Sequence, residues 1–203
     1  GVIHWYHVEE LACDIKISRA VNIGVIDVKP YKTVVSQGFN CRINVTVTNA
    51  GPFPETFDLT LYAQTMPPGV PIGTTTVYNM LSGTTRTITF TWNTAGFAMG
   101  NYTIWAYAWP VLGETYMPDN TFTDSWIFVG LVGDVNGNRK VDLDDVLAVA
   151  LAYGSNRGAS GRFWHQPPCR VCPHDPNLDI DDNDKIDLTD YLWVVINYGH
   201  VGP

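Results

Sequence analysis

The sequence predicts a mainly β protein, in which a β-sandwich is followed by a small α-helical unit. Two observations predict this division. Residues 20 to 130 contain a series of segments in which apolar and polar side chains alternate, the two-residue period of strands that bury one face. Residues 131 to 203 instead contain two copies of a polar loop that leads into an apolar segment with helical spacing. A chain of 203 residues is long enough for one large and one small domain.

The first 19 residues lie outside the sandwich pattern and are predicted to form an N-terminal extension. Within it, the segment "LACDIKIS" alternates apolar with polar residues, as a strand does. An exposed segment with so many apolar side chains would be an aggregation hazard, so we expect it to pair with a sheet. Either it pairs with an edge of its own sandwich, or it adds a strand to a neighbouring subunit and drives polymerisation.

Residues 20 to 130 are predicted to form an immunoglobulin-like β-sandwich. The segments "INVTVT", "FDLTLY", "TITFTW" and "YTIWAYAW" each alternate apolar with polar residues. Turn-forming stretches such as "NAGPFP", "LSG" and "MPDN" separate them at the intervals typical of a sandwich. Each sheet is therefore expected to bury one face and to leave the other in water.

Two stretches of the helical unit have the spacing of an EF-hand-type calcium loop: "DVNGNRKVDLDD", residues 134 to 145 (loop one), and "DIDDNDKIDLTD", residues 179 to 190 (loop two). In such a loop, positions 1, 3, 5, 9 and 12 supply side-chain oxygens and position 7 supplies a backbone carbonyl, a set that suits a hard cation. The sequence thus predicts two Ca²⁺ sites. The predicted ligands are Asp134, Asn136, Asn138, Lys140, Asp142 and Asp145 in loop one, and Asp179, Asp181, Asn183, Lys185, Asp187 and Asp190 in loop two.

The loops differ in charge and in their turn residues. Loop two offers more side-chain carboxylates at ligand positions than loop one, so loop two should bind calcium first. Position 6 makes a sharp turn that favours glycine, but this chain has Arg139 and Asp184 there. Of these two residues, aspartate tolerates a positive φ better.

The repeat extends beyond the loops, because "LDDVLAVALAYG" and "LTDYLWVVINYG" align at the same offset. Each loop is expected to lead into a helix that ends near Gly154 or Gly199. The two helices are expected to pack in antiparallel fashion through their apolar stripes. These stripes are Val146, Leu147, Ala150 and Leu151 in the first helix, and Tyr191, Leu192, Val195 and Ile196 in the second.

The duplicated unit, which opens with "GDVNGN" and carries aspartate rather than glutamate at position 12, resembles a type I dockerin. The resemblance covers residues 131 to 203, including an insert at residues 156 to 174. It implies a calcium-binding domain with paired sites, and domains of this family often bind a cohesin domain. A cohesin-like protein is therefore one candidate partner.

The sandwich also resembles a known family. The segments "VNIGVIDVKPYKTVVSQGF", "INVTVTNAG", "TFTWNTAGFAMGNYTIWAYAWP" and "GETYMPDNTFTD" are similar to the CARDB (cell adhesion-related) domain of bacterial and archaeal surface proteins, over residues 21 to 130. This resemblance implies a surface or adhesion module without catalysis. In archaeal secreted proteins, such a module is often followed directly by a dockerin-like unit.

Four cysteines make an even count and suggest two disulfides. Cys169 and Cys172 in the insert form a C-x-x-C pair, which is either a local disulfide or, with His165 and His174, a zinc site. In an oxidising compartment the disulfide is the simpler reading. The remaining two, Cys13 and Cys41, would tie the N-terminal extension to the sandwich, within one chain or between two chains.

Several features indicate an extracellular protein. The tripeptides "NVT" at Asn44 and "NYT" at Asn101 are glycosylation acceptors, and calcium loops of this type need the calcium found outside cells. The 20 acidic residues outnumber the 12 basic ones, which argues against nucleic acid or an anionic membrane as a partner. No apolar run approaches the ~20 residues of a membrane span.

The sequence therefore predicts an extracellular, calcium-binding structural protein of the cell surface, which assembles with copies of itself into a filament or another surface assembly. It contains none of the common catalytic motifs, so we do not expect an enzyme. The alternative function is an adhesion or docking module. Such a module would bind a cohesin-like protein, or a glycan through the alternating aromatics Trp105, Tyr107 and Trp109.

Overall fold

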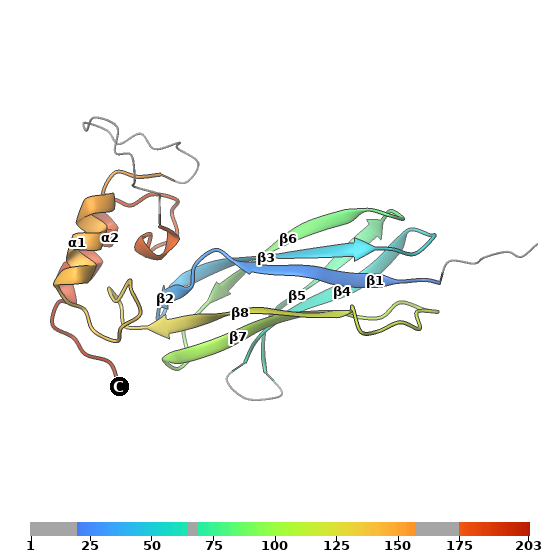
Figure 1. The fold of residues 1–203 in the computed structure, drawn as a ribbon, viewed down its shortest axis with the longest axis horizontal. Coiled ribbons are helices and arrows are strands. Elements are labelled where there is room, and N and C mark those ends of the chain that lie inside the picture. The colour runs from blue at the N-terminus through green and yellow to red at the C-terminus, as the bar shows by residue number, and fades with distance from the viewer. Residues whose placement is uncertain (1–19, 65–68, 157–174) are drawn as a thin grey trace, which may run out of the picture.

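The alternating segments form the strands of two sheets (Figure 1). The computed structural model describes residues 20–64, 69–156 and 175–203. The three-stranded sheet has the order β1-β3-β6, and the five-stranded sheet has the order β2-β8-β7-β4-β5. Strand pairs are antiparallel except for β2 and β8, which run parallel. The strands are β1 (Ile23–Pro30), β2 (Val34–Ser36), β3 (Asn40–Asn49), β4 (Glu55–Gln64), β5 (Val70–Met80), β6 (Thr85–Asn93), β7 (Gly100–Ala108) and β8 (Thr121–Gly130).

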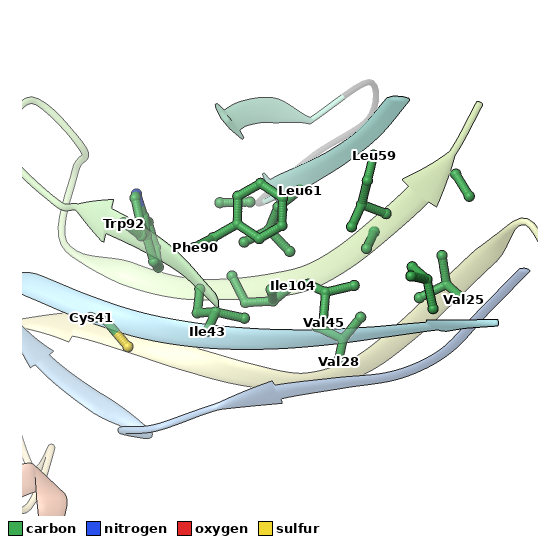
Figure 2. Close-up of a cluster of buried hydrophobic side chains, with 14 of the residues drawn as sticks. Val25, Val28, Cys41, Ile43, Val45, Leu59, Leu61, Phe90, Trp92 and Ile104 are labelled. Atoms are coloured by element: carbon green, nitrogen blue, oxygen red, sulfur yellow. The ribbon is translucent and has the colours of Figure 1, made fainter. Parts of the chain in front are cut away.

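The two sheets enclose one hydrophobic core, as the alternation predicts. Every second residue of β3 is buried, so Ile43 and Val45 point between the sheets. Leu59, Leu61 and Ile104 of the other sheet meet them there (Figure 2). Each of these side chains is fully buried, and burial of such a side chain contributes about 1.5–3 kcal/mol to stability.

The helical unit lies at the end of the sandwich beside β2 and the end of β8 (Figure 1). It contains α1 (Leu143–Ala152), a short 3-10 helix η1 (Pro176–Leu178) and α2 (Leu188–Ile196). Asp142 and Asp187 are the N-caps of α1 and α2, and each forms a capping box with the acid three residues later. Among the described residues, no helix is long and apolar enough to cross a membrane.

Each helix is tied at its end to the loop that precedes the other helix. The N–H of Gly154, after α1, donates to the carbonyl of Ile186, and the N–H of Gly199, after α2, donates to the carbonyl of Val141, at 2.7 and 2.8 Å. Both glycines have a positive φ, near 85°, which confirms that the helices end there. Because each helix ends beside the start of the other, the two helices run antiparallel, as predicted.

The two helices pack on each other as predicted, but the prediction of the residues that make the contact is wrong. Val149 and Val194 are the fully buried side chains between the helices, with Ile186 and Val141 of the loops around them. Most of the predicted stripe is exposed instead: Leu147, Ala150, Leu151, Leu192, Val195 and Ile196. The loops fill the space that a second helical stripe would need, so helices this short bury only one narrow row each.

The N-terminal extension, including Cys13, lies outside the described residues, as does nearly all of the insert with His165, Cys169, Cys172 and His174. The donor strand, the zinc alternative and the disulfides therefore stay predictions.

Candidate metal centre

The two loops share a set of four internal hydrogen bonds, as expected of a true repeat. In both, the position 1 carboxylate accepts the N–H groups of positions 5 and 6, and the position 12 carboxylate accepts those of positions 2 and 9. The bonds from position 6 to position 1 are 2.8 and 2.9 Å long, and those from position 9 to position 12 are both 2.9 Å. The remaining bonds differ by no more than 0.3 Å between the loops: Asn138 and Asn183 to position 1, and Val135 and Ile180 to position 12.

The carboxylates at positions 1 and 12 are buried in both loops. Asp134, Asp145, Asp179 and Asp190 are each at most 1% exposed. Burial raises the pKa of all four above the ordinary value, and raises that of Asp179 to about 6, although neighbouring N–H donors and, at Asp179, the ammonium of Lys32 partly offset this effect. A bound cation would favour the ionised form of these groups.

The left-handed turn at position 6 is confirmed in both loops. Arg139 has a φ of 70° and Asp184 a φ of 69°. Position 4 is also left-handed, as Gly137 in loop one (φ 74°) and Asp182 in loop two (φ 63°). Loop two therefore holds two left-handed residues that are not glycine, a conformation that side chains disfavour.

Loop two gathers its carboxylates most closely. Asp179, Asp181 and Asp190 each place a carboxylate oxygen within 4.8 Å of the others, an arrangement that could hold a metal ion. No other group of three acidic, histidine or cysteine ligands meets this criterion in the described part of the chain. Loop one has amides, Asn136 and Asn138, at positions 3 and 5, so its ligand set is less charged. Oxygen ligands from carboxylates and amides fit a hard cation such as Ca²⁺.

The other predicted ligands lie around the same loops. Asp142 and Asp187 at position 9 each use one carboxylate oxygen to cap a helix, and the second oxygen of Asp187 accepts a hydrogen bond from Asn183 of loop two at 3.5 Å. Lys140 and Lys185 at position 7 each form a β-bridge, Lys140 with Val201 and Lys185 with Asn156. These bridges fix the backbone of position 7, where a carbonyl ligand is expected.

Loop two also contacts the sandwich, through residues that the sequence did not point to. Arg42 of β3 forms two paired contacts, with Asp182 (2.9 and 3.0 Å) and with Asp184 (2.6 and 3.2 Å). Both carboxylates raise the pKa of Arg42 above its ordinary value, Asp184 the more. Lys32, which is 2% exposed, donates to the carbonyls of Asp179 and Ile180.

Further contacts join the two units. The side chain of Asn177 accepts the N–H groups of Thr33 and Val34, at 2.9 and 3.1 Å. The rings of Phe39 and Trp193 meet edge to face, with centroids 5.3 Å apart. Segments on both sides of β2 thus hold the helical unit against the sandwich.

The remaining predicted sites lie on the sandwich. Among the described residues Cys41 has no disulfide partner; its thiol is fully buried, and burial raises its pKa to about 11. Its bridge to Cys13 stays a prediction. Asn101 on β7 is exposed, whereas Asn44 on β3 is half-buried and accepts a hydrogen bond from Thr89 at 2.7 Å.

The aromatic row on β7 is largely paired with other side chains. Trp105 stacks on Tyr62, with centroids 4.1 Å apart and an interplanar angle of 8°. Tyr107 meets Trp109 edge to face at 5.2 Å, and the indole N–H of Trp109 donates to Thr60. Trp105 and Tyr107 are half-buried, whereas Trp109 remains 49% exposed.

Comparison with known proteins gives one family match. Residues 23–110 match the family model of the CARDB domain. No curated protein matches the sequence. The crystal structure of a CARDB domain from Pyrococcus furiosus, in complex with di-metal ions, is 21% identical; the match covers 56% of this chain and 96% of that one, with a TM-score of 0.47.

Two enzymes contain a similar region. A β-glucosidase from Erythrobacter marinus is 14% identical over 54% of this chain and 15% of its own, with a TM-score of 0.43. A cycloisomaltooligosaccharide glucanotransferase from Paenibacillus sp. is 19% identical over 64% of this chain and 18% of its own, with a TM-score of 0.42. All these TM-scores lie below 0.5, so the assignment rests on the family model. The matched range lies within the 21 to 130 predicted by resemblance, and residues 23–110 form a CARDB domain.

Proposed function

We propose that this chain is an extracellular, calcium-binding structural protein of the cell surface, with a dockerin-like unit that binds one Ca²⁺ in each loop. The observation that carries the proposal is the duplicated hydrogen-bond network around the buried carboxylates Asp134, Asp145, Asp179 and Asp190. Four buried acids with raised pKa values destabilise the metal-free loops at neutral pH. Calcium would offset this cost and make the unit stable outside the cell.

Calorimetric titration tests the calcium sites. Two ions per chain should bind, and Asp179→Asn and Asp134→Asn should each remove one of them, because each substitution takes a carboxylate from position 1 of one loop. The exposed Asp58→Asn on β4 is the matched control and should leave both sites intact. A protein that binds no calcium at millimolar concentration would refute the proposal.

We further propose that the chain assembles with copies of itself. Support comes from the apolar face that the helices leave exposed. Its residues repeat between the two helices at the same offset, and six of them are at least 45% exposed: Leu143, Leu147, Leu151, Leu188, Leu192 and Ile196. An apolar surface of this kind on an extracellular protein usually marks a protein contact. The predicted N-terminal donor strand would add a second contact.

Light scattering and negative-stain imaging in calcium test the assembly. Wild type should form large particles, while the double variant Leu151→Ser, Ile196→Ser should give smaller ones or monomers. The matched control is Leu112→Ser, which changes a leucine that is 99% exposed on the sandwich. Monomeric wild type would contradict self-assembly.

Docking to a cohesin-like protein is the second candidate function, and the same duplicated helix face favours it. In that case wild type is monomeric in calcium and binds a cohesin domain in a calcium-dependent way. Glycan binding is less favoured, because the aromatics of β7 contact one another and Tyr62.

A further inference from the structure

We propose that Arg42 of the CARDB domain is a positioning residue for the calcium site of loop two, so that the affinity of this site depends on the sandwich. This inference rests on the proposed calcium function of loop two and adds an element from outside the loop. It concerns two residues, Asp182 and Asp184, that stand at positions 4 and 6, which are not ligand positions.

The geometry of the contact is specific. One edge of the Arg42 guanidinium, Nε and Nη2, donates to the two carboxylate oxygens of Asp182 at 2.9 and 3.0 Å. The other edge, Nη1 and Nη2, donates to the two oxygens of Asp184 at 3.2 and 2.6 Å. Two paired charged hydrogen-bond sets fix both the direction and the distance of the two aspartates, which a single point charge would not do.

Arg42 is itself held in place. Its guanidinium lies over the ring of Tyr31, 4.9 Å from the centroid, and its side chain is only 23% exposed. Beside it, the buried ammonium of Lys32 lies 3.7 Å from Asp182 and donates to the loop backbone at Asp179 and Ile180. The arginine is thus a preorganised part of the sandwich surface.

The residues that Arg42 holds are the two that most need support. Asp182 and Asp184 both have a left-handed backbone, and the ligands Asp181 and Asn183 alternate with them in the chain. Fixing positions 4 and 6 therefore fixes the backbone that presents positions 3 and 5 to the metal. If the contact is lost, the loop must become ordered when calcium binds, which lowers the affinity.

Loop one provides an internal comparison. At its positions 4 and 6 stand Gly137 and Arg139, where no paired carboxylates exist for a sandwich cation. Gly137 instead packs closely beside Val34, and Arg139 lies over the ring of Phe128 at 5.9 Å. Loss of Arg42 should therefore leave the affinity of loop one unchanged.

Electrostatics alone predict the opposite change, which is tighter calcium binding to loop two when Arg42 is lost. Removing the arginine takes one positive charge away from beside the site, so the site would attract calcium slightly more strongly. Because Lys32 still lies 3.7 Å from Asp182 after Arg42 is removed and offsets part of this attraction, we expect the loss of ordering to dominate. The direction of the change in affinity therefore decides between the two effects.

The test is calcium calorimetry on the full chain in an Asp134→Asn background, which silences loop one. Arg42→Ala should weaken calcium binding to loop two roughly tenfold, or about 1.4 kcal/mol. Arg42→Lys keeps the charge but loses the paired geometry, so it should also weaken binding. Arg86→Ala is the matched control, because Arg86 is an exposed arginine on the neighbouring strand β6 whose side chain donates to the carbonyl of Tyr78.

The same substitutions in an Asp179→Asn background report on loop one, where Arg42→Ala should have no effect. The double variant Asp182→Asn, Asp184→Asn breaks the contact from the loop side, but it also removes two negative charges that attract calcium, so it is read together with Arg42→Ala and Arg42→Lys. It should weaken loop two similarly, and adding Arg42→Ala should then cost little more.

Unchanged or tighter binding in Arg42→Ala, or full affinity in Arg42→Lys, would overturn the role of Arg42. If the parent protein binds no calcium, the proposed function fails instead.

Discussion

Removing calcium should destabilise the helical unit at neutral pH much more than in mild acid. The magnitude follows from Asp179, which is fully buried and whose pKa burial raises from 3.8 to about 6. Since one pKa unit is worth about 1.36 kcal/mol, keeping this carboxylate ionised at pH 7 costs the calcium-free fold about 3 kcal/mol relative to the unfolded chain. Calcium at 100 times its dissociation constant adds about 2.7 kcal/mol per site.

The pH window follows from the sign of this difference. Between pH 4 and pH 6 the folded protein binds more protons at Asp179 than the unfolded chain does. The contribution of this group to stability is therefore fully present below about pH 4 and is lost as the pH rises through 6. Asp134, Asp145 and Asp190, whose pKa values burial also raises, act in the same direction.

Circular dichroism at 222 nm and calorimetric melting, with chelator or with calcium, measure the effect at pH 7 and pH 5. With chelator, the melting temperature of the helical unit should be higher at pH 5 than at pH 7. With calcium it should be higher at pH 7, because protons compete with the ion at pH 5. The melting of the sandwich should respond much less. A helical unit that melts at the same temperature with and without chelator at pH 7 would refute the reasoning.

Three further predictions concern single residues. Loop two should bind calcium before loop one, so calorimetry of Asp179→Asn should show only the weaker site, and equal sites would contradict the ranking. Cys41 is fully buried with a pKa of about 11, so peptide mass spectrometry after alkylation at pH 8 should find it unmodified in the native protein but modified after reduction in denaturant. Ile43→Ala should destabilise the sandwich by about 2–5 kcal/mol in chemical denaturation, whereas Ile26→Ala, at a residue that is 45% exposed, should cost far less.

The local parts of the structure could be predicted from the sequence because their determinants are close together in the chain. Alternation in "INVTVT" sets which residues of β3 face the core, and ligand spacing sets the fold of both loops. The aspartates at positions 1 and 12 bind loop N–H groups no more than ten residues away. Such contacts depend only on the spacing of residues along the chain, so the repeat can be recognised from the sequence.

The buried side of each helix could not be predicted from the spacing of its apolar residues. Both helices are apolar on more than one side, so periodicity selected Leu147 and Leu192, whereas the structure buries Val149 and Val194. Which side is buried depends on the hydrogen bonds that join the end of each helix to the loop before the other helix, because these bonds place Val141 and Ile186 beside those valines. These bonds join residues of the two repeats, so the sequence of one repeat alone does not predict them.

The sequence by itself thus determined the strands, the two loops and their carboxylates, whereas only the tertiary structure decided what supports them. Asp182 and Asp184 appear in the sequence as two surplus acids, and Arg42 as one charge on a strand. They meet across 140 and 142 residues, because β3 begins beside the helical unit and presents the Arg42 guanidinium there. A contact between distant residues depends on how two folded surfaces fit together, and spacing along the chain carries no record of that fit.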